Sequence, residues 1–307
     1  MKKRHYALFL LLLLAFAFPL QSTKVNKSDL DAGYILVGRV DEAEGFFGVN
    51  DRGDQLIFSR VRVKVERWIK GRDGNSIEFI VEGGSVGDLA LKVSEYPEFS
   101  RGERYRLSLD KIGPAFKFRE GEVIEEAGIS GKPVRPTSTC CKTIAKWASY
   151  PVPYFVNPNC SDITKTGGQT DIENGAREWV VSGTEILSYK GTTASTQIAY
   201  NGKNDVFFDN SSSGSAIAAT YMWYTRKGGE MLEFDMIFFD AAWKFYSSNA
   251  DCDGGFYVQT IAAHEFGHAV GLDHNRCTWS LMYPYADYCE TNTVTADDLA
   301  CLAGLYQ

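Results

Sequence analysis

The chain is organised around one stretch, His264-Glu265-Phe266-Gly267-His268-Ala269-Val270-Gly271-Leu272-Asp273-His274. If its first residues are helical, His264 and His268 lie four apart on one helix face, where both imidazoles can bind a single metal ion. Gly271 accepts positive φ, so the helix can stop there and the chain can turn back to bring His274 under the metal. Glu265 would take a proton from a zinc-activated water and later pass it to the leaving group. The stretch therefore predicts a catalytic zinc site.

A methionine soon afterwards extends the pattern, in Ser280-Leu281-Met282-Tyr283-Pro284. The combined pattern resembles the metzincin clan of zinc peptidases. The residues of the motif are similar to those of the matrixins, the family of the matrix metalloproteinases and their bacterial relatives. The resemblance extends from about residue 146 to 307. The resemblance implies an α+β domain with a twisted, mostly parallel sheet and three helices, in which Met282 supports the metal site from below. Pro284 stands where other metzincins place a metal-binding tyrosine, so no tyrosine ligand is expected.

Histidine usage favours a functional site over three unrelated side chains. The chain has four histidines, and all except His5 fall in this stretch. The main alternative is a catalytically silent protein that binds peptides or surfaces and keeps zinc as a structural ion. Glu265 argues against it, because a closed structural site needs no general base. We expect one catalytic Zn²⁺ and a protein or peptide substrate; a selective maturation protease with one partner stays open beside a degradative enzyme.

Composition narrows the class of protein and its partners. The 307 residues are enough for about two domains, and a net charge of −7 with a pI near 5.3 gives no reason to expect nucleic acid. Residues 1–22 begin with basic residues and continue as a short apolar run, which is typical of a secretory signal peptide. We expect a secreted monomer, extracellular or periplasmic, without stable membrane insertion once the signal is removed. An uncleaved N-terminal anchor is the alternative.

The seven cysteines all lie in the second half of the chain. In an exported protein they indicate disulfides, and the odd count leaves one over. Pairing Cys277 with Cys289 would staple the segment around the methionine. Cys140 and Cys141 follow a linker by composition at residues 127–139. By the resemblance, the alternative is a free cysteine that binds the zinc and keeps the enzyme inactive. The matrixin sequence pattern around such a cysteine is absent here, so disulfides are expected.

Residues 23–126 predict a separate β domain. Valines alternate with charged residues in Arg60-Val61-Arg62-Val63-Lys64-Val65-Glu66, which places one face in a core and the other in water. Similar short runs predict a small antiparallel barrel; they are Ile35–Val40, Ile77–Val81, Leu89–Val93 and Tyr105–Leu109. The segment resembles OB-like barrels of the netrin and tissue-inhibitor type. Its role is open between a pro-region that occludes the catalytic cleft, a binding module and a folding aid.

Residues 140–307 form the expected catalytic domain. By the resemblance, four of its residues correspond to the family's edge strand above the zinc: Ala216, Ile217, Ala218 and Ala219. An exposed edge pairs with an extended peptide through main-chain hydrogen bonds; an interior strand is the alternative. Pro284 and Tyr285 stand where the family builds a wall of the pocket for the residue after the scissile bond. Ala286 replaces the usual tyrosine of that wall, so the depth of the pocket is left open.

Two further expectations concern metals and helix ends. No histidine remains for the second, structural zinc of animal matrixins. Ca²⁺ is a candidate because six aspartates could supply oxygen ligands; they are Asp205, Asp209, Asp235, Asp240, Asp251 and Asp253. Their presence in solvated loops explains them equally well.

Thr170 is expected to cap a helix that runs to about Ser182. Thr295 is expected to open the last helix with a capping box.

Overall fold

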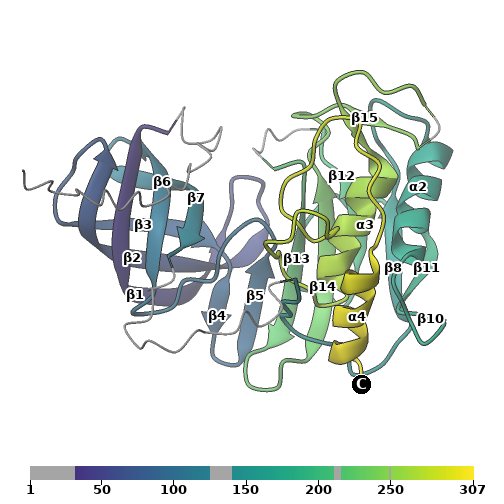
Figure 1. Ribbon diagram of the computed structural model, residues 1–307, viewed down its shortest axis with the longest axis horizontal. Coiled ribbons are helices and arrows are strands. Elements are labelled where there is room, and N and C mark those ends of the chain that lie inside the picture. Colours follow the sequence, from purple (N-terminus) through teal and green to yellow (C-terminus); the bar gives the residue numbers. More distant parts are fainter. Residues whose placement is uncertain (1–31, 125–139, 211–215, 249) are drawn as a thin grey trace, which may run out of the picture.

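The computed structural model describes residues 32–124, 140–210, 216–248 and 250–307. The expected signal peptide at 1–22 and linker at 127–139 lie outside these residues. The described chain forms an N-terminal barrel beside a larger part that combines a sheet with helices (Figure 1). No helix among the described residues has both the length and the apolar character that crossing a membrane would require.

Five strands close the barrel in the order β1-β2-β3-β7-β6. Most neighbours are antiparallel, as expected, but β3 and β7 run parallel. The valine pattern of β2 points inward as predicted, and Val61 and Val63 are buried with Leu36, Phe79 and Leu107. The barrel strands are β1 (Tyr34–Val49), β2 (Gln55–Lys70), β3 (Ser76–Glu82), β6 (Arg104–Ile112) and β7 (Ala115–Val123).

The larger part is built on a sheet in the order β11-β8-β12-β14-β13-β5-β4. The first four strands run parallel to one another, so that within residues 140–307 three of the four neighbour pairs are parallel, as expected for that part. β5 and β4 add two antiparallel pairs from the N-terminal half, so the sheet as a whole is mixed. The strands are β4 (Gly84–Val86), β5 (Leu89–Val93), β8 (Val152–Asn157), β11 (Leu187–Thr192), β12 (Asp205–Phe208), β13 (Ala218–Thr225) and β14 (Met231–Phe238). Four short strands form two separate pairs: β9 (Val180–Val181), β10 (Thr184–Glu185), β15 (Phe245–Tyr246) and β16 (Phe256–Tyr257).

The prediction that Leu89–Val93 continues the barrel is wrong. This strand is β5, and it pairs with β13, which lies in residues 140–307. Four of its five residues are buried, including Lys92. A strand covered on both faces suits a sheet interior, whereas the alternating strands of the barrel have one wet face.

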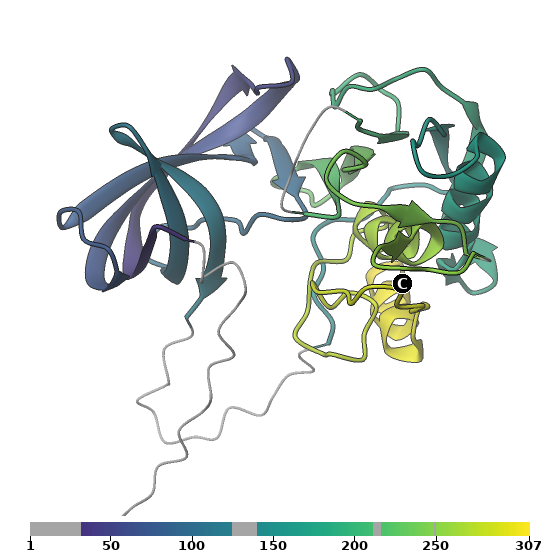
Figure 2. The same ribbon diagram turned by 90° about the horizontal axis from the view of Figure 1, so that it is seen from above.

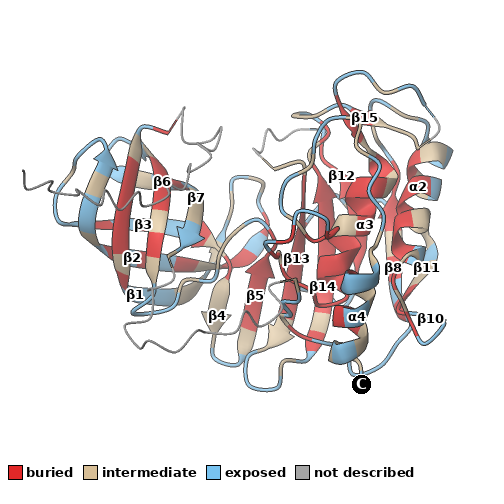
Figure 3. Ribbon diagram, in the orientation of Figure 1, coloured by how far each residue is buried: buried red, intermediate tan, exposed pale blue. Residues whose placement is uncertain are grey.

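Three helices lie in the described residues: α2 (Lys165–Arg177), α3 (Val258–Ala269) and α4 (Ala296–Leu305). Helix α3 carries the histidine stretch and is buried over most of its length (Figure 3). It packs closely on α2, because Gly175 has no side chain; a Cβ there would lie 2.7 Å from the Ala263 nitrogen. The apolar core thus fixes the helix that carries His264 and His268.

The expected start of α2 is wrong, whereas that of α4 is confirmed. Thr164, not Thr170, caps α2 by accepting a hydrogen bond from the Gly167 N–H. The helix also ends at Arg177, before Trp179, whose indole N–H donates to the Ala263 carbonyl at 2.7 Å. The sequence predicts a helix that runs to about Ser182, but tertiary contacts end it earlier. The capping box at Thr295 is present.

The barrel and the seven-stranded sheet share a hydrophobic core. Leu56 and Ile57 of β2 pack there with Leu91 and Val93 of β5. Their partners from residues 140–307 are Ile198, Phe207, Ala219, Tyr221, Trp223 and Ile237. Figure 2 shows the barrel and the larger part side by side, connected by the blue segment that contains β4 and β5. The two halves therefore bury apolar surface against each other.

Three disulfides cross-link residues 140–307: Cys140–Cys277, Cys141–Cys301 and Cys252–Cys289. Disulfides at Cys140 and Cys141 agree with expectation, but the predicted pairing of Cys277 with Cys289 is wrong. The prediction pairs cysteines that are close in sequence. The fold instead brings Cys140 to Cys277, after His274, and Cys141 to Cys301 of α4. Cys160 is free.

Candidate metal centre and active site

The three histidines of the stretch converge on one point. The Nε2 atom of His274 lies 3.0 Å from that of His264 and 3.2 Å from that of His268. Nitrogen ligands about 2.0–2.1 Å from a tetrahedral zinc would be roughly 3.3 Å apart. The three side chains thus have the spacing of a zinc site.

Two of these histidines are fixed in the form that a metal needs. The Nδ1–H of His264 donates to the Leu281 carbonyl at 2.6 Å, and that of His268 donates to the Leu272 carbonyl at 2.9 Å. Each Nε2 therefore keeps its lone pair toward the common point. Burial lowers the pKa of all three, to about 3 for His268, where the neighbouring His264 adds to the effect. Neutral imidazoles are the form that binds zinc.

Gly271 makes the turn that brings in the third histidine. Its φ is 102°, a value that favours glycine. A Cβ there would overlap the Ala145 carbonyl oxygen. The turn is closed by hydrogen bonds from the Gly271 N–H to the His268 carbonyl at 2.8 Å and from the Leu272 N–H to the Gly267 carbonyl at 2.9 Å. Gly271 therefore meets both the backbone and the space requirement of the predicted turn.

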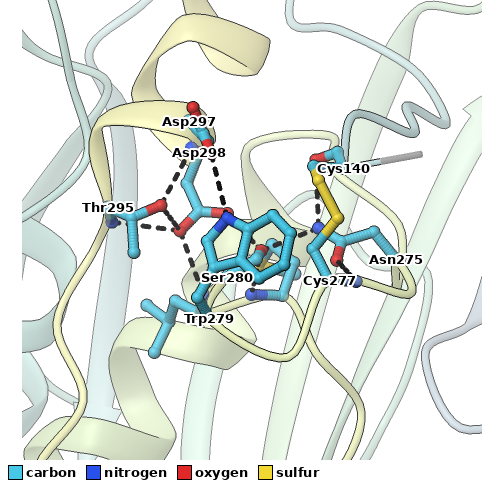
Figure 4. The surroundings of a disulfide bond; sticks show 10 residues. Cys140, Asn275, Cys277, Trp279, Ser280, Thr295, Asp297 and Asp298 are labelled. Carbon is cyan, nitrogen blue, oxygen red and sulfur yellow. Dashed lines mark hydrogen bonds between the residues drawn. A yellow bond between two sulfur atoms is a disulfide. The ribbon is translucent and has the colours of Figure 1, made fainter. Parts of the chain in front are cut away.

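Met282 packs against α3 at Gly267, which lies between His264 and His268 in the helix. It is buried, and a Cβ on Gly267 would collide with its sulfur. The Ser280 hydroxyl holds this segment: it accepts from the Met282 N–H at 3.0 Å and donates to Asp298 at 2.5 Å. Figure 4 shows this network beside the Cys140–Cys277 disulfide, where the Asn275 amide donates to the Cys140 carbonyl at 3.1 Å. The segment that carries Met282 is thus tied both to α4, through Asp298, and to Cys140.

Glu265 lies on α3 next to the histidines and is buried. The Thr220 hydroxyl of β13 is 2.7 Å from Oε2 of this carboxylate and 3.1 Å from the Glu265 carbonyl. The pKa of Glu265 is raised to about 8, first by burial and then by the charge of Glu95, while Thr220 and Ser94 lower it. A proton acceptor with a pKa near neutral is suited to general-base chemistry.

The strand that carries the predicted substrate-binding residues is not the edge of its sheet. β13 begins at Ala218, preceded by Ala216 and Ile217, and it lies between β14 and β5. Ala218 and Ala219 are each only 2% exposed. The prediction that this strand is an exposed edge is therefore wrong, because β5 of the same chain pairs with Tyr221–Thr225. The pairing ends near Thr220, so Ala216–Ala219 extend beyond the last residue of β5.

Pro284 and Tyr285 lie on the chain that follows Met282, and both are exposed. The Tyr285 ring contacts Tyr283, with 5.5 Å between ring centroids. Its hydroxyl donates to Glu120 of the barrel at 3.0 Å. Tyr285 therefore contacts the barrel, which the sequence did not suggest.

Sequence reasoning missed several residues around the site. Lys92 is 5% exposed, and its ammonium lies 3.8 Å from Asp273, whose other oxygen lies 2.5 Å from Lys142. Burial would raise the pKa of Asp273, but the two lysines lower it below its ordinary value. Ser94 and Thr220 were missed as well. The one available signal was a lysine inside the apolar run Leu89–Val93.

The aspartates considered for calcium do not gather at one place. Asp209 pairs with Arg52, and Asp240 accepts from the Ser161 N–H at 2.7 Å. Asp205 and Asp235 lie together with Glu233, and burial raises the pKa of Asp235 well above its usual range. One Asp205 carboxylate oxygen is buried without a hydrogen-bond partner among the described residues. A hard cation would suit that oxygen, although both Asp235 oxygens already accept backbone N–H groups.

Comparison with known proteins agrees with this geometry. The matrixin family model matches residues 146–307. Matrix metalloproteinase-9 of Canis lupus familiaris is 43% identical over 54 residues, which are 18% of this chain and 8% of that protein. The 72 kDa type IV collagenase of Gallus gallus is 38% identical over 55 residues, again 18% and 8%. Matrix metalloproteinase-19 of Mus musculus is 27% identical over 118 residues, 38% of this chain and 20% of that protein. The matched part spans no more than a fifth of these relatives.

Proposed function

The chain belongs to the matrixin family, and on that premise we propose that it is a secreted, zinc-dependent endopeptidase that hydrolyses peptide bonds in proteins. One observation carries the proposal: three neutral histidines direct Nε2 atoms at one point, and a buried carboxylate lies beside them. Bound there, zinc would activate the attacking water and polarise the scissile carbonyl. Its ligands would be His264, His268 and His274.

Glu265 would accept the proton of the attacking water and deliver it to the leaving amine. Thr220 is a positioning residue for this step, because its hydroxyl holds Oε2. Oε1 of Glu265 accepts no hydrogen bond from the described residues, so it is free to accept the proton of the attacking water. Met282 and Gly271 would support the site, by packing and by the turn. The alternative of a silent binding protein gains no support from an arrangement that positions a general base.

Substrate would lie across the metal between β13 and the segment after Met282. The backbone of Ala216–Ala219 would pair with an extended peptide, and Pro284 and Tyr285 would border the pocket for the residue after the scissile bond. Export through the segment at 1–22 is supported by the three disulfides, which persist in oxidising compartments. We propose a monomer, with Ca²⁺ near Asp205 as a second, structural ion.

The test is cleavage of a diverse peptide library by the purified exported form, with and without a chelator. We expect chelator-sensitive cleavage, restored by zinc, and its loss together with the zinc in His268→Ala. Glu185→Ala is the matched control, because this glutamate is exposed in the same half of the chain. Cleavage that survives complete removal of the metal would refute a zinc peptidase.

A further inference from the structure

The outer side of β13 is covered by the chain's own N-terminal half. β5 runs antiparallel to β13, with Val93 opposite Tyr221. One residue further on, the Ser94 N–H donates to the Thr220 carbonyl at 2.9 Å, and the Thr220 N–H donates to the Ser94 hydroxyl at 3.0 Å. A peptide that added antiparallel to this side of β13 would need the same backbone groups. β5 and such a peptide therefore compete for one position.

The end of β5 reaches the catalytic carboxylate. The Ser94 hydroxyl lies 3.5 Å from Oε2 of Glu265. Glu95 follows Ser94 directly and is exposed. β5 thus approaches the site in the direction in which the residues before a scissile bond would approach it.

Lys92 fastens this end of the strand to the metal-binding turn. Its ammonium donates to the Val93 carbonyl at 3.2 Å and to the Tyr96 carbonyl, so it closes the turn after β5. The same ammonium lies near Asp273, the residue before His274. A buried ammonium is retained only with such partners. Lys92 therefore links the covering strand directly to the turn of the zinc site.

The barrel also reaches the opposite wall of the site. Tyr285, on the segment after Met282, donates to Glu120 of β7 at 3.0 Å. On the β13 side, the Tyr224 hydroxyl donates to Glu98. The N-terminal half consequently contacts both walls between which a substrate would lie.

From these contacts we propose that residues 89–95 inhibit the enzyme in cis. They fill the strand position that a substrate's residues before the scissile bond would take. This inference rests on the proposed peptidase function, since it concerns the same site. No cysteine occurs in residues 32–124, so the inhibition works by strand pairing and not by a thiol on the metal. Leu91 and Val93 anchor the strand in the shared core, with exposures of 0% and 2%.

The test compares two probes on the full, zinc-loaded exported chain. Acetohydroxamate reaches only the metal, whereas a tripeptide hydroxamate would also extend along β13. Ser94→Pro/Glu95→Ala removes the pairing at the end of β5, and Lys92→Met removes the ion pair. Lys64→Met and Glu122→Ala are matched controls, because both residues are exposed on the barrel. Zinc content and thermal midpoint are measured for every variant.

Both site variants should bind the tripeptide probe at least about tenfold more tightly than the unaltered chain, because backbone hydrogen bonds of β13 become available. The control variants should match the unaltered chain, and acetohydroxamate should bind all forms alike. Equal affinity of the tripeptide probe for the unaltered chain and both site variants would overturn the inference. If Ser94→Pro/Glu95→Ala does not fold, Lys92→Met decides. Amide exchange adds a check on the unaltered chain, where tight probe binding with unchanged protection of residues 89–94 would also overturn it.

Cleavage of a fluorogenic peptide with several residues before the scissile bond separates the two proposals. Faster cleavage by the site variants, lost again with Glu265→Ala, supports both. Tighter probe binding without cleavage in any form would contradict the peptidase function and keep the strand competition. Equal cleavage by the unaltered chain and both site variants would contradict inhibition and keep the peptidase.

Discussion

The hydroxyl of Thr220 donates a hydrogen bond to the Glu265 carboxylate, with 2.7 Å between Oγ1 and Oε2. This contact joins β13, along which the proposed substrate would lie, to α3, the helix that carries His264 and His268. Thr220→Val keeps the shape of the side chain and removes the donor. We expect kcat to fall about tenfold, since a hydrogen bond to a charged group contributes about 1.5 kcal/mol or more.

The Thr220 variants should be measured in the Ser94→Pro/Glu95→Ala background, so that access to β13 is equal in all of them. Thr220→Ser should restore most of the rate because it keeps the hydroxyl, and KM and zinc content should change little. An unchanged kcat in Thr220→Val would show that this hydroxyl does not position the general base.

Gly271→Ala tests the turn that delivers His274. The new Cβ would add the strain of positive φ, about 1 kcal/mol, to an overlap with the Ala145 carbonyl. We expect loss of zinc affinity as well as of stability, measured by metal titration and urea unfolding. Gly254→Ala is the control: its φ of 72° imposes the strain, but nothing lies within 4 Å of the added Cβ. Equal effects of the two substitutions would refute a special role for the turn.

Breaking the two disulfides of the adjacent cysteines Cys140 and Cys141 one after the other should cost unequal amounts of stability. With Cys141–Cys301 intact, breaking Cys140–Cys277 frees a loop between residues 277 and 301 and should cost about 3 kcal/mol in the free energy of unfolding. Once both disulfides are broken, no link remains across sequence separations of 137 and 160 residues. The second removal therefore frees a much longer loop and should lower the free energy of unfolding more than the first. Serine variants compared by urea unfolding check this, and a negligible second loss would contradict it.

Buried acids predict a fall in stability with rising pH. Burial, then neighbouring carboxylates, raise the pKa of Asp235 and Glu233, while backbone N–H groups lower it. Such acids keep their protons in the folded state at pH values where the unfolded chain has lost them. The folded state then binds more protons, so the free energy of unfolding decreases from about pH 4 upward through the folded pKa.

Asp235→Asn should flatten this dependence, measured by urea unfolding at several pH values with constant zinc. Asp251→Asn, at an exposed position, is the control and should leave the slope unchanged. Calcium should raise the midpoint most at the upper end of the range if it binds near Asp205. An identical slope in Asp235→Asn and the unaltered chain would contradict the assignment.

The local part of the site could be predicted from the sequence, because the spacing of His264 and His268 and the position of Gly271 are set by helix and turn geometry. Met282 was placed by resemblance, and its support of a metal site stays a prediction; the structure shows it buried against Gly267. The role of Leu89–Val93 could not be predicted: its pattern indicates a strand, but its partner β13 lies more than a hundred positions away. The cysteine pairing failed for the same reason, since sequence distance does not determine which loops meet. Lys92, Ser94 and Thr220 act through that long-range contact.

The most direct test of the account is the Glu265→Ala variant in the Ser94→Pro/Glu95→Ala background, with zinc content and peptide turnover measured on the same preparation. Removing the general base while its three histidine neighbours remain should leave zinc bound at the level of the parent and lower kcat at least about a hundredfold. Full zinc content with undiminished turnover would contradict the role of Glu265 on which the proposed mechanism depends.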